Sequence, residues 1–105
     1  MSSAADTFEV RNEVEAGRFE VEVDGLTAFT TYRIEGEDII FPHTVTPEAL
    51  EGRGIASALV RAGLAFAEAE GLRVVPRCSF WAGYITRHPE YLPLVHPDYR
   101  ERLRP

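Results

Sequence analysis

The hydrophobic pattern of this 105-residue chain changes its period once, near Thr46-Pro47, and this change limits the fold more than any other feature. Before it, apolar and polar residues alternate or β-forming residues cluster, which is typical of strands. After it, Ile55, Leu59, Ala62 and Phe66 recur at helical spacing, which predicts a helix over 55–70. We expect four strands before this helix, over 8–12, 19–23, 26–35 and 39–45.

Short turns join the early strands, which favours antiparallel pairing. Asp24-Gly25 is a strong two-residue hairpin signal, and a second turn falls at 35–38. Gly71 is suited to end the helix. A fifth strand over 72–78 follows, parallel to a neighbour if the crossover is of the usual kind, and then a short helix over 81–87. The order ββββ-α-β-α indicates an α+β fold with a mostly antiparallel five-stranded sheet.

Length and charge bound the domain and its partners. We expect a flexible N-terminus (1–7), one domain (8–92) and a C-terminal tail (93–105) with a last turn near 98–103. The net charge of −6 disfavours nucleic acid and anionic lipid, and no apolar run approaches a membrane span. A single cysteine, Cys78, and the lack of a signal peptide fit a cytoplasmic protein.

The segment Gly52-Arg53-Gly54-Ile55-Ala56-Ser57 carries the clearest chemical signal. Two glycines inside a helix would cost about 2 kcal/mol relative to alanine, so a loop that leads into the helix is favoured. At a helix start, main-chain N–H groups lack intrahelical partners and the helix dipole is positive. Such a loop suits an anion such as a pyrophosphate, with Arg53 as a charged contact, although the glycines alone are equally typical of a tight loop.

Other phosphate motifs fit this segment less well. A Walker loop requires Gly-Lys-Ser/Thr at its end, which the chain lacks. A dinucleotide fingerprint requires glycine at the position of Ser57 and a carboxylate about 20 residues later, where Arg77-Cys78 stands.

The segment resembles the Gln/Arg-x-x-Gly-x-Gly/Ala element of GNAT acetyltransferases. Gly54 and Ala56 match its last two defined positions, whereas Glu51 stands where glutamine or arginine is usual, so we expect its carboxylate to point outward. Several further elements, in this order along the chain, resemble the short single-domain branch of that superfamily over roughly residues 8–92: His43-Thr44, Pro47-Glu48, Val75-Pro76-x-Cys78, Tyr84-Ile85 and His88-Pro89-Glu90-Tyr91.

This resemblance implies a fold, a ligand and a site. The ligand is acetyl-CoA, held between the fourth and fifth strands, and no metal is implied. Main-chain N–H groups near Val45 and Thr46 would polarise the acyl carbonyl. The predicted cofactor-binding residues are Val45, Thr46, Gly52, Arg53, Gly54, Ile55, Ala56 and Ser57.

Three residues are candidates for proton transfer. Cys78, at the end of the fifth strand, is either an acid toward the CoA sulfur, a transient acyl acceptor, or a small core residue. Tyr84 is the rival proton donor, or else packs the short helix. His43 suits an amine base because histidine titrates near neutral pH, or else it is structural. His88 and His96 complete three scattered histidines, and with one cysteine these do not make a metal site. Packing is the preferred role for Phe80 and Trp81, although either could stack on adenine.

Three functions follow from this reading. The first is an N-acetyltransferase that acts on an amine of a small molecule or peptide, with a cationic acceptor favoured by the acidic surface. The second is an acyl-CoA-binding or sensing module with little turnover, because 105 residues leave little chain for an acceptor pocket. The third is an interaction domain without a cofactor. The sequence leaves the oligomeric state open.

Overall fold

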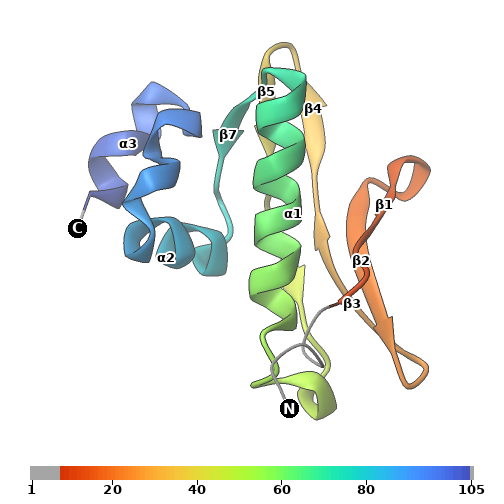
Figure 1. Ribbon diagram of the computed structural model, residues 1–105. Coiled ribbons are helices and arrows are strands. Elements are labelled where there is room, and N and C mark those ends of the chain that lie inside the picture. Colours follow the sequence, from red (N-terminus) through yellow and green to blue (C-terminus); the bar gives the residue numbers. More distant parts are fainter. Residues whose placement is uncertain (1–7, 105) are drawn as a thin grey trace.

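The computed structural model describes residues 8–104, in which strands precede and helices follow a long central helix (Figure 1). The expected flexible segment 1–7 lies outside the described residues. The strands are β1 (Arg11–Glu13), β2 (Arg18–Val23), β3 (Leu26–Thr31), β4 (Arg33–Glu35), β5 (Asp38–Ile40), β6 (Thr44–Val45) and β7 (Arg73–Val75). The helices are α1 (Ile55–Glu70), α2 (Ser79–Arg87) and α3 (Pro97–Leu103), with short 3₁₀ segments η2 (Val14–Ala16), η3 (Glu48–Leu50) and η4 (Pro89–Leu94).

Strands β2 and β3 form the antiparallel hairpin that Asp24-Gly25 predicts. Val23 pairs with Leu26 across the turn, and φ is 54° at Asp24 and 79° at Gly25. Positive φ at both central residues is the geometry of a type I′ turn, whose twist matches that of the strands. The register then sets which side chains of the hairpin face α1.

The α+β class is confirmed, but the strands are divided differently from the expected single five-stranded sheet. Seven short strands form two sheets, in the orders β1-β2-β3-β6 and β4-β5-β7. The expected third strand (26–35) is interrupted at Tyr32, whose N–H bonds the Gly17 carbonyl instead of a neighbouring strand. The expected fourth strand (39–45) is interrupted at Phe41–His43, where Pro42 has no N–H for a ladder.

The first and fifth strands also differ from their expected bounds. The first is Arg11–Glu13, in place of 8–12, and runs into the turn η2. The fifth is Arg73–Val75, in place of 72–78, because Pro76 follows it directly. It lies parallel to β5, with Ile39 opposite Val74, and α1 makes the connection between the two.

Helix α1 has the bounds that its apolar spacing predicts. Its buried residues include Ile55, Leu59 and Leu64, and it packs against β2, β3 and β7. Gly71 ends it in the left-handed conformation (φ 69°) and donates its N–H to the last-turn carbonyls, as a C′ glycine does. Figure 1 shows α1 crossing in front of the strands, with the hairpin on one side and β7 on the other.

The two sheets diverge beyond Phe41. The Phe41 N–H bonds the Val75 carbonyl at 3.0 Å, and the Cys78 N–H bonds the Phe41 carbonyl at 3.0 Å. After this point β6 pairs with β3, whereas the chain from Cys78 enters α2. The divergence opens a space beside the N-terminus of α1.

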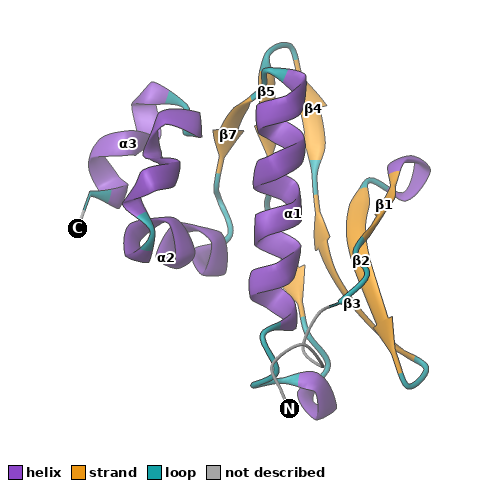
Figure 2. Ribbon diagram, in the orientation of Figure 1, coloured by secondary structure: helices purple, strands orange, loops and turns teal. Residues whose placement is uncertain are grey.

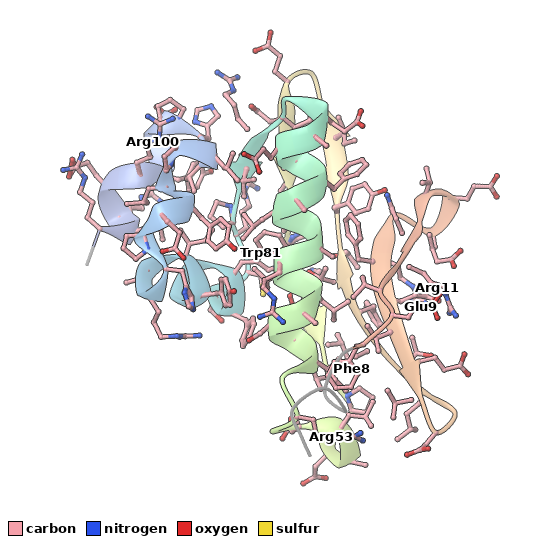
Figure 3. All side chains as sticks on the ribbon, in the orientation of Figure 1. Phe8, Glu9, Arg11, Arg53, Trp81 and Arg100 are labelled. Carbon is pink, nitrogen blue, oxygen red and sulfur yellow. The ribbon has the colours of Figure 1, made fainter. Side chains whose placement is uncertain are left out.

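Trp81 fills the interior directly above this divergence. Its ring stacks on Phe41 with centroids 3.7 Å apart, and its Nε1–H donates to Thr30 Oγ1 at 2.9 Å. It also lies against Gly63 of α1, where a Cβ would stand 2.6 Å from a Trp81 ring carbon. Trp81 is fully buried, so the expected packing role is confirmed (Figure 3).

The C-terminal residues pack on the domain in place of trailing from it. Val95 and Leu103 belong to the hydrophobic core, and the His96 N–H bonds the Val74 carbonyl at 2.8 Å. Figure 2 shows α2 and α3 beside β7, on the other side of α1 from the β2–β3 hairpin. The expected last turn at 98–103 is the helix α3, and α2 starts two residues earlier than expected.

A charge network fixes the outer face of the hairpin. Arg11 and Arg18 donate to the two carboxylate oxygens of Glu20 at 2.9 and 2.8 Å. These bonds, that of Arg11 first, lower the pKa of Glu20, while its burial acts in the opposite direction.

Within residues 8–104, every helix falls short of the length and apolarity that a membrane crossing requires.

Replacement of two glycines in helices by alanine, one at a time, tests the packing at Trp81. Gly63→Ala places its methyl group within 2.6 Å of the Trp81 ring, and overpacking of about 1–3 kcal/mol exceeds the gain of about 1 kcal/mol in helix propensity. Gly83→Ala gains the same propensity in α2, and its methyl meets only the flexible end of Arg87 at 3.4 Å. In urea unfolding, Gly63→Ala should be less stable and Gly83→Ala more stable than the wild type. A Gly63→Ala protein as stable as the wild type would contradict this packing.

Candidate functional site

A pocket of about 660 Å³ lies where the two sheets diverge, which is within the size range of small-molecule sites. The end of β6, the loop from η3 to α1, the first turn of α1 and one residue of α2 form its walls. The lining residues are Thr44, Val45, Thr46, Leu50, Glu51, Gly52, Gly54, Ile55, Ala56, Ser57 and Phe80. They include all the predicted cofactor-binding residues except Arg53.

Two left-handed glycines shape the loop that enters α1. Gly52 and Gly54 have φ of 82° and 81°, which an L side chain adopts only with strain. A Cβ built on either glycine would meet nothing within 4 Å, so the space in front of the loop is open. We call this loop the glycine cradle. Side chains at positions 52 and 54 would occupy the open space beside it.

Buried residues hold both ends of this loop. Leu50 in η3 and Ile55 at the start of α1 are almost fully buried. The first helical bond runs from the Ala58 N–H to the Gly54 carbonyl at 3.1 Å. Within residues 8–104, the N–H groups of 52–57 have no acceptor, so up to six donors and the positive end of the α1 dipole border the open space. This arrangement suits an anion with several oxygen atoms.

The register of β6 decides which main-chain groups face the pocket. Thr30 pairs with Thr44, and the Thr31 N–H bonds the His43 carbonyl at 2.9 Å. The alternation of an antiparallel ladder then assigns the Val45 N–H to β3 and turns the Thr44 N–H away from it. Of the main-chain donors in β6, that of Thr44, one residue before the expected position, faces the divergence.

A chain of side-chain hydrogen bonds connects Cys78 to the core. The Cys78 thiol donates to Thr44 Oγ1 at 3.3 Å, and the hydroxyls of Thr44 and Thr30 lie 3.0 Å apart. Thr30 in turn accepts from Trp81. Because Thr44 lines the pocket, Cys78 lies directly behind the pocket wall.

His43 and Tyr84, like Cys78, are not among the residues that line this pocket. The His43 side chain is exposed, and its main-chain carbonyl is the part that the fold uses, as an acceptor for Thr31. Tyr84 is buried, with its ring 4.3 Å from His88 and 6.1 Å from Tyr91. Burial raises the pKa of Tyr91, with the neighbouring Tyr84 a smaller cause. The structure therefore does not bring Cys78, Tyr84 and His43 together.

Arg53 lies beside the loop without lining the pocket. Its guanidinium carbon is 6.0 Å from the centre of the Phe8 ring, and both side chains lie near the start of α1 (Figure 3). The interaction ties the N-terminal segment to the loop.

Four lining residues were missing from the predicted site. They are Thr44, Leu50, Glu51 and Phe80. Phe80 precedes Trp81 on α2; it packs against the core, as expected, and it also lines the pocket. Glu51 is exposed, as expected, but it also borders the pocket. In the described part of the chain, no three His, Cys, Asp or Glu side chains form a metal-binding group.

Comparison with known sequences identifies the family. The model of the GCN5-related N-acetyl-transferase family matches residues 18–94, about three quarters of the chain. The chain belongs to this family. Its matched region contains the hairpin, the pocket, β7 and α2, and members of the family generally use acetyl-CoA.

Curated relatives of this acetyltransferase-family chain include Protein NATD1 from several vertebrates. The mouse protein is 35% identical over 99 residues, which cover 91% of this chain and 84% of NATD1. The bovine protein is 36% identical over 91 residues, covering 84% of this chain and 75% of NATD1. The human protein is 35% identical over the same coverage.

Substitution of Gly54 tests the glycine cradle. Gly54→Val fills the open space in front of the loop, so we expect at least about tenfold weaker binding of acetyl-CoA by calorimetry. Gly36→Val is a matched control, because Gly36 also has positive φ (61°) and an open Cβ position, but lies in the β4–β5 turn. The control should share the loss of stability and keep the affinity. Equal affinities of the two variants would exclude the loop from the site.

Proposed function

We propose that this protein is an acetyl-CoA-dependent N-acetyltransferase that transfers an acetyl group to an amine. The main support is the pocket at the divergence of β6 and β7, whose floor is the open glycine loop at the start of α1. Membership of the acetyltransferase family supplies the reaction class.

The pocket residues fit the ligand. A pyrophosphate requires several converging donors, and the N–H groups of 52–57 supply them without a competing acceptor in residues 8–104. Ala56 and Ser57 are small and permit close approach of the ligand. The side chains of Val45 and Phe80 form apolar parts of the pocket wall, against which the rest of acetyl-CoA can lie. Glu51, at the rim, opposes an anion and makes this cradle weaker than one with glutamine or arginine there.

We assign two tasks at the acyl end to residues of the chain. Bound acetyl-CoA supplies an acyl thioester, and the rest of the chemistry belongs to the protein. The Thr44 N–H, which points away from β3, is placed to polarise a carbonyl at the divergence. Cys78 holds a proton at Sγ, directed toward Thr44 Oγ1, and can deliver it to a leaving sulfur.

The acceptor is an amine that enters from the open side of the pocket. Among the residues that line the described pocket, Glu51 alone has an ionisable side chain. The proton of the amine therefore passes to Glu51 or to water. The acidic overall charge favours a cationic acceptor in the encounter.

One observation favours a second function. Neither His43 nor Tyr84 lines the pocket, so the side-chain base and the second acid expected of an active enzyme are not placed there. The alternative is a module that binds or senses acyl-CoA with little turnover. Release of CoA with and without an added amine, such as a polyamine or a lysine peptide, separates the two functions.

Thermal melting tests the ligand. Acetyl-CoA at one hundred times its dissociation constant adds about 2.7 kcal/mol to the stability, which raises the midpoint of a domain of this size by roughly 10 °C. NADPH, which also carries a pyrophosphate and adenine, is the control and should give a much smaller shift. Equal shifts would indicate a general anion site, and no shift with acetyl-CoA would overturn the proposal.

Replacement of Cys78 tests the acid. Cys78→Ala removes one thiol at the pocket wall and should fold, while the transfer rate falls on the order of 100-fold. Tyr84→Phe is the control and should keep the rate, because the Tyr84 ring lies against His88 and Tyr91, whereas Cys78 bonds the lining residue Thr44. Equal rates for Cys78→Ala and the wild type would assign proton delivery to water.

The composition of the chain allows a direct search for an acyl-enzyme. All eleven basic residues are arginine, so the chain has no lysine side chain to acetylate, and Cys78 is its one thiol. Label from acetyl-CoA that hydroxylamine removes, and that Cys78→Ala lacks, would show that Cys78 accepts the acyl group. Transfer without such label fits a proton donor.

A further inference from the structure

The charge of the chain is divided unevenly along its length. Residues 71–105 contain six arginines and three carboxylates, a net charge of +3. Residues 1–70 carry a net charge of −9. The C-terminal third is therefore a basic region of an acidic protein, and it is the region that packs beside β7 as α2, η4 and α3 (Figure 2).

A second pocket, of about 490 Å³, lies within this basic region. It is formed between the end of β7, α2 and α3, and shares no lining residue with the first pocket. Its lining residues are Pro76, Arg77, Ala82, Tyr99, Arg102 and Leu103.

The lining divides into an apolar part and a basic part. Pro76 and Leu103 are buried and Ala82 is half-buried, so these three form apolar walls that the core holds in place. Arg77 and Arg102 are exposed. The Arg102 guanidinium carbon lies 5.2 Å from the centre of the Tyr99 ring, which restricts this long side chain.

Among the described residues, no carboxylate lies within ion-pair distance of Arg77 or Arg102. Within residues 8–104, five arginines form ion pairs, and Arg77 and Arg102 are among the six that do not; the paired ones are Arg11, Arg18, Arg33, Arg73 and Arg104. The lining contains no acidic residue. A guanidinium presents paired N–H donors that match the oxygen atoms of a carboxylate or phosphate.

We propose that this pocket binds a small organic oxyanion, a carboxylate or phosphate ester with an apolar body. The oxyanion pairs with Arg77 and Arg102, and the hydrocarbon lies against Pro76, Ala82 and Leu103. The site does not depend on the acetyltransferase function.

Amide chemical shifts measured with simple probes test this site. Hexanoate and hexyl phosphate should shift the amides of Arg77, Ala82, Tyr99, Arg102 and Leu103, and bind at least about tenfold more tightly than neutral hexanamide. Whichever of hexanoate and hexyl phosphate binds more tightly identifies the preferred oxyanion. Hexanamide binding as tightly as both anions, or shifts confined to other residues, would overturn the proposal.

Matched variants separate the pocket from the general charge. R77Q, R102Q and the double variant should weaken binding of the preferred anion, the double variant at least about tenfold. R87Q is the control, because Arg87 is an exposed arginine of α2 outside the pocket and its loss changes the net charge equally. An equal loss of affinity in R87Q would show attraction by net charge alone. If the double variant fails to fold, the two single variants still test the pocket.

The same titration in saturating acetyl-CoA separates this site from the proposed function. Independent binding of the anion and acetyl-CoA agrees with two sites. Displacement of the anion by acetyl-CoA would overturn the second site and leave the first intact. Binding of the anion to a protein that fails to bind acetyl-CoA would preserve this inference and remove the proposed function.

Discussion

The packing of Trp81 is the constraint on which the rest of the structure depends. One indole contacts the helix α1 at Gly63, the strand end at Phe41 and the hydroxyl of Thr30. It therefore joins both sheets to α1 and fixes α2 against them. Immediately beyond this contact, β6 follows β3 and the chain after β7 turns away. The pocket lies where this packed core ends, and main-chain groups without partners in the described residues border it.

Much of this architecture follows from local sequence rules. The Asp24-Gly25 turn, the bounds of α1 and its end at Gly71 depend on neighbouring residues, and pattern alone predicts them. Most of the pocket lining followed from the resemblance to the acetyltransferase element, which includes Gly52 and Gly54, two glycines that tolerate positive φ. Thr44 and Phe80 were missed because their position depends on how two sheets separate, which no short segment encodes.

The strand bounds that were wrong and the positions of the predicted site residues both depend on tertiary geometry. Tyr32 and Pro42 interrupt two strands that look continuous in sequence, and this divides the expected sheet in two. His43 and Tyr84 have suitable chemistry, but His43 lies exposed in the connection before β6, and Tyr84 is buried in α2. Arg53 adjoins the glycines in sequence, and its guanidinium lies over Phe8. The Cys78 thiol contacts the pocket lining through its hydrogen bond to Thr44, and Cys78 itself lies on the opposite side of the divergence.

The measurement that tests the account most directly is amide hydrogen exchange with and without saturating acetyl-CoA. The N–H groups of 52–57 lack acceptors in the described chain and should exchange fast in the free protein. Bound ligand should slow exchange in this segment and at Thr44, with little change in the β4–β5 turn. Protection that appears elsewhere, or fast exchange of residues 52–57 in the saturated protein, would contradict the account.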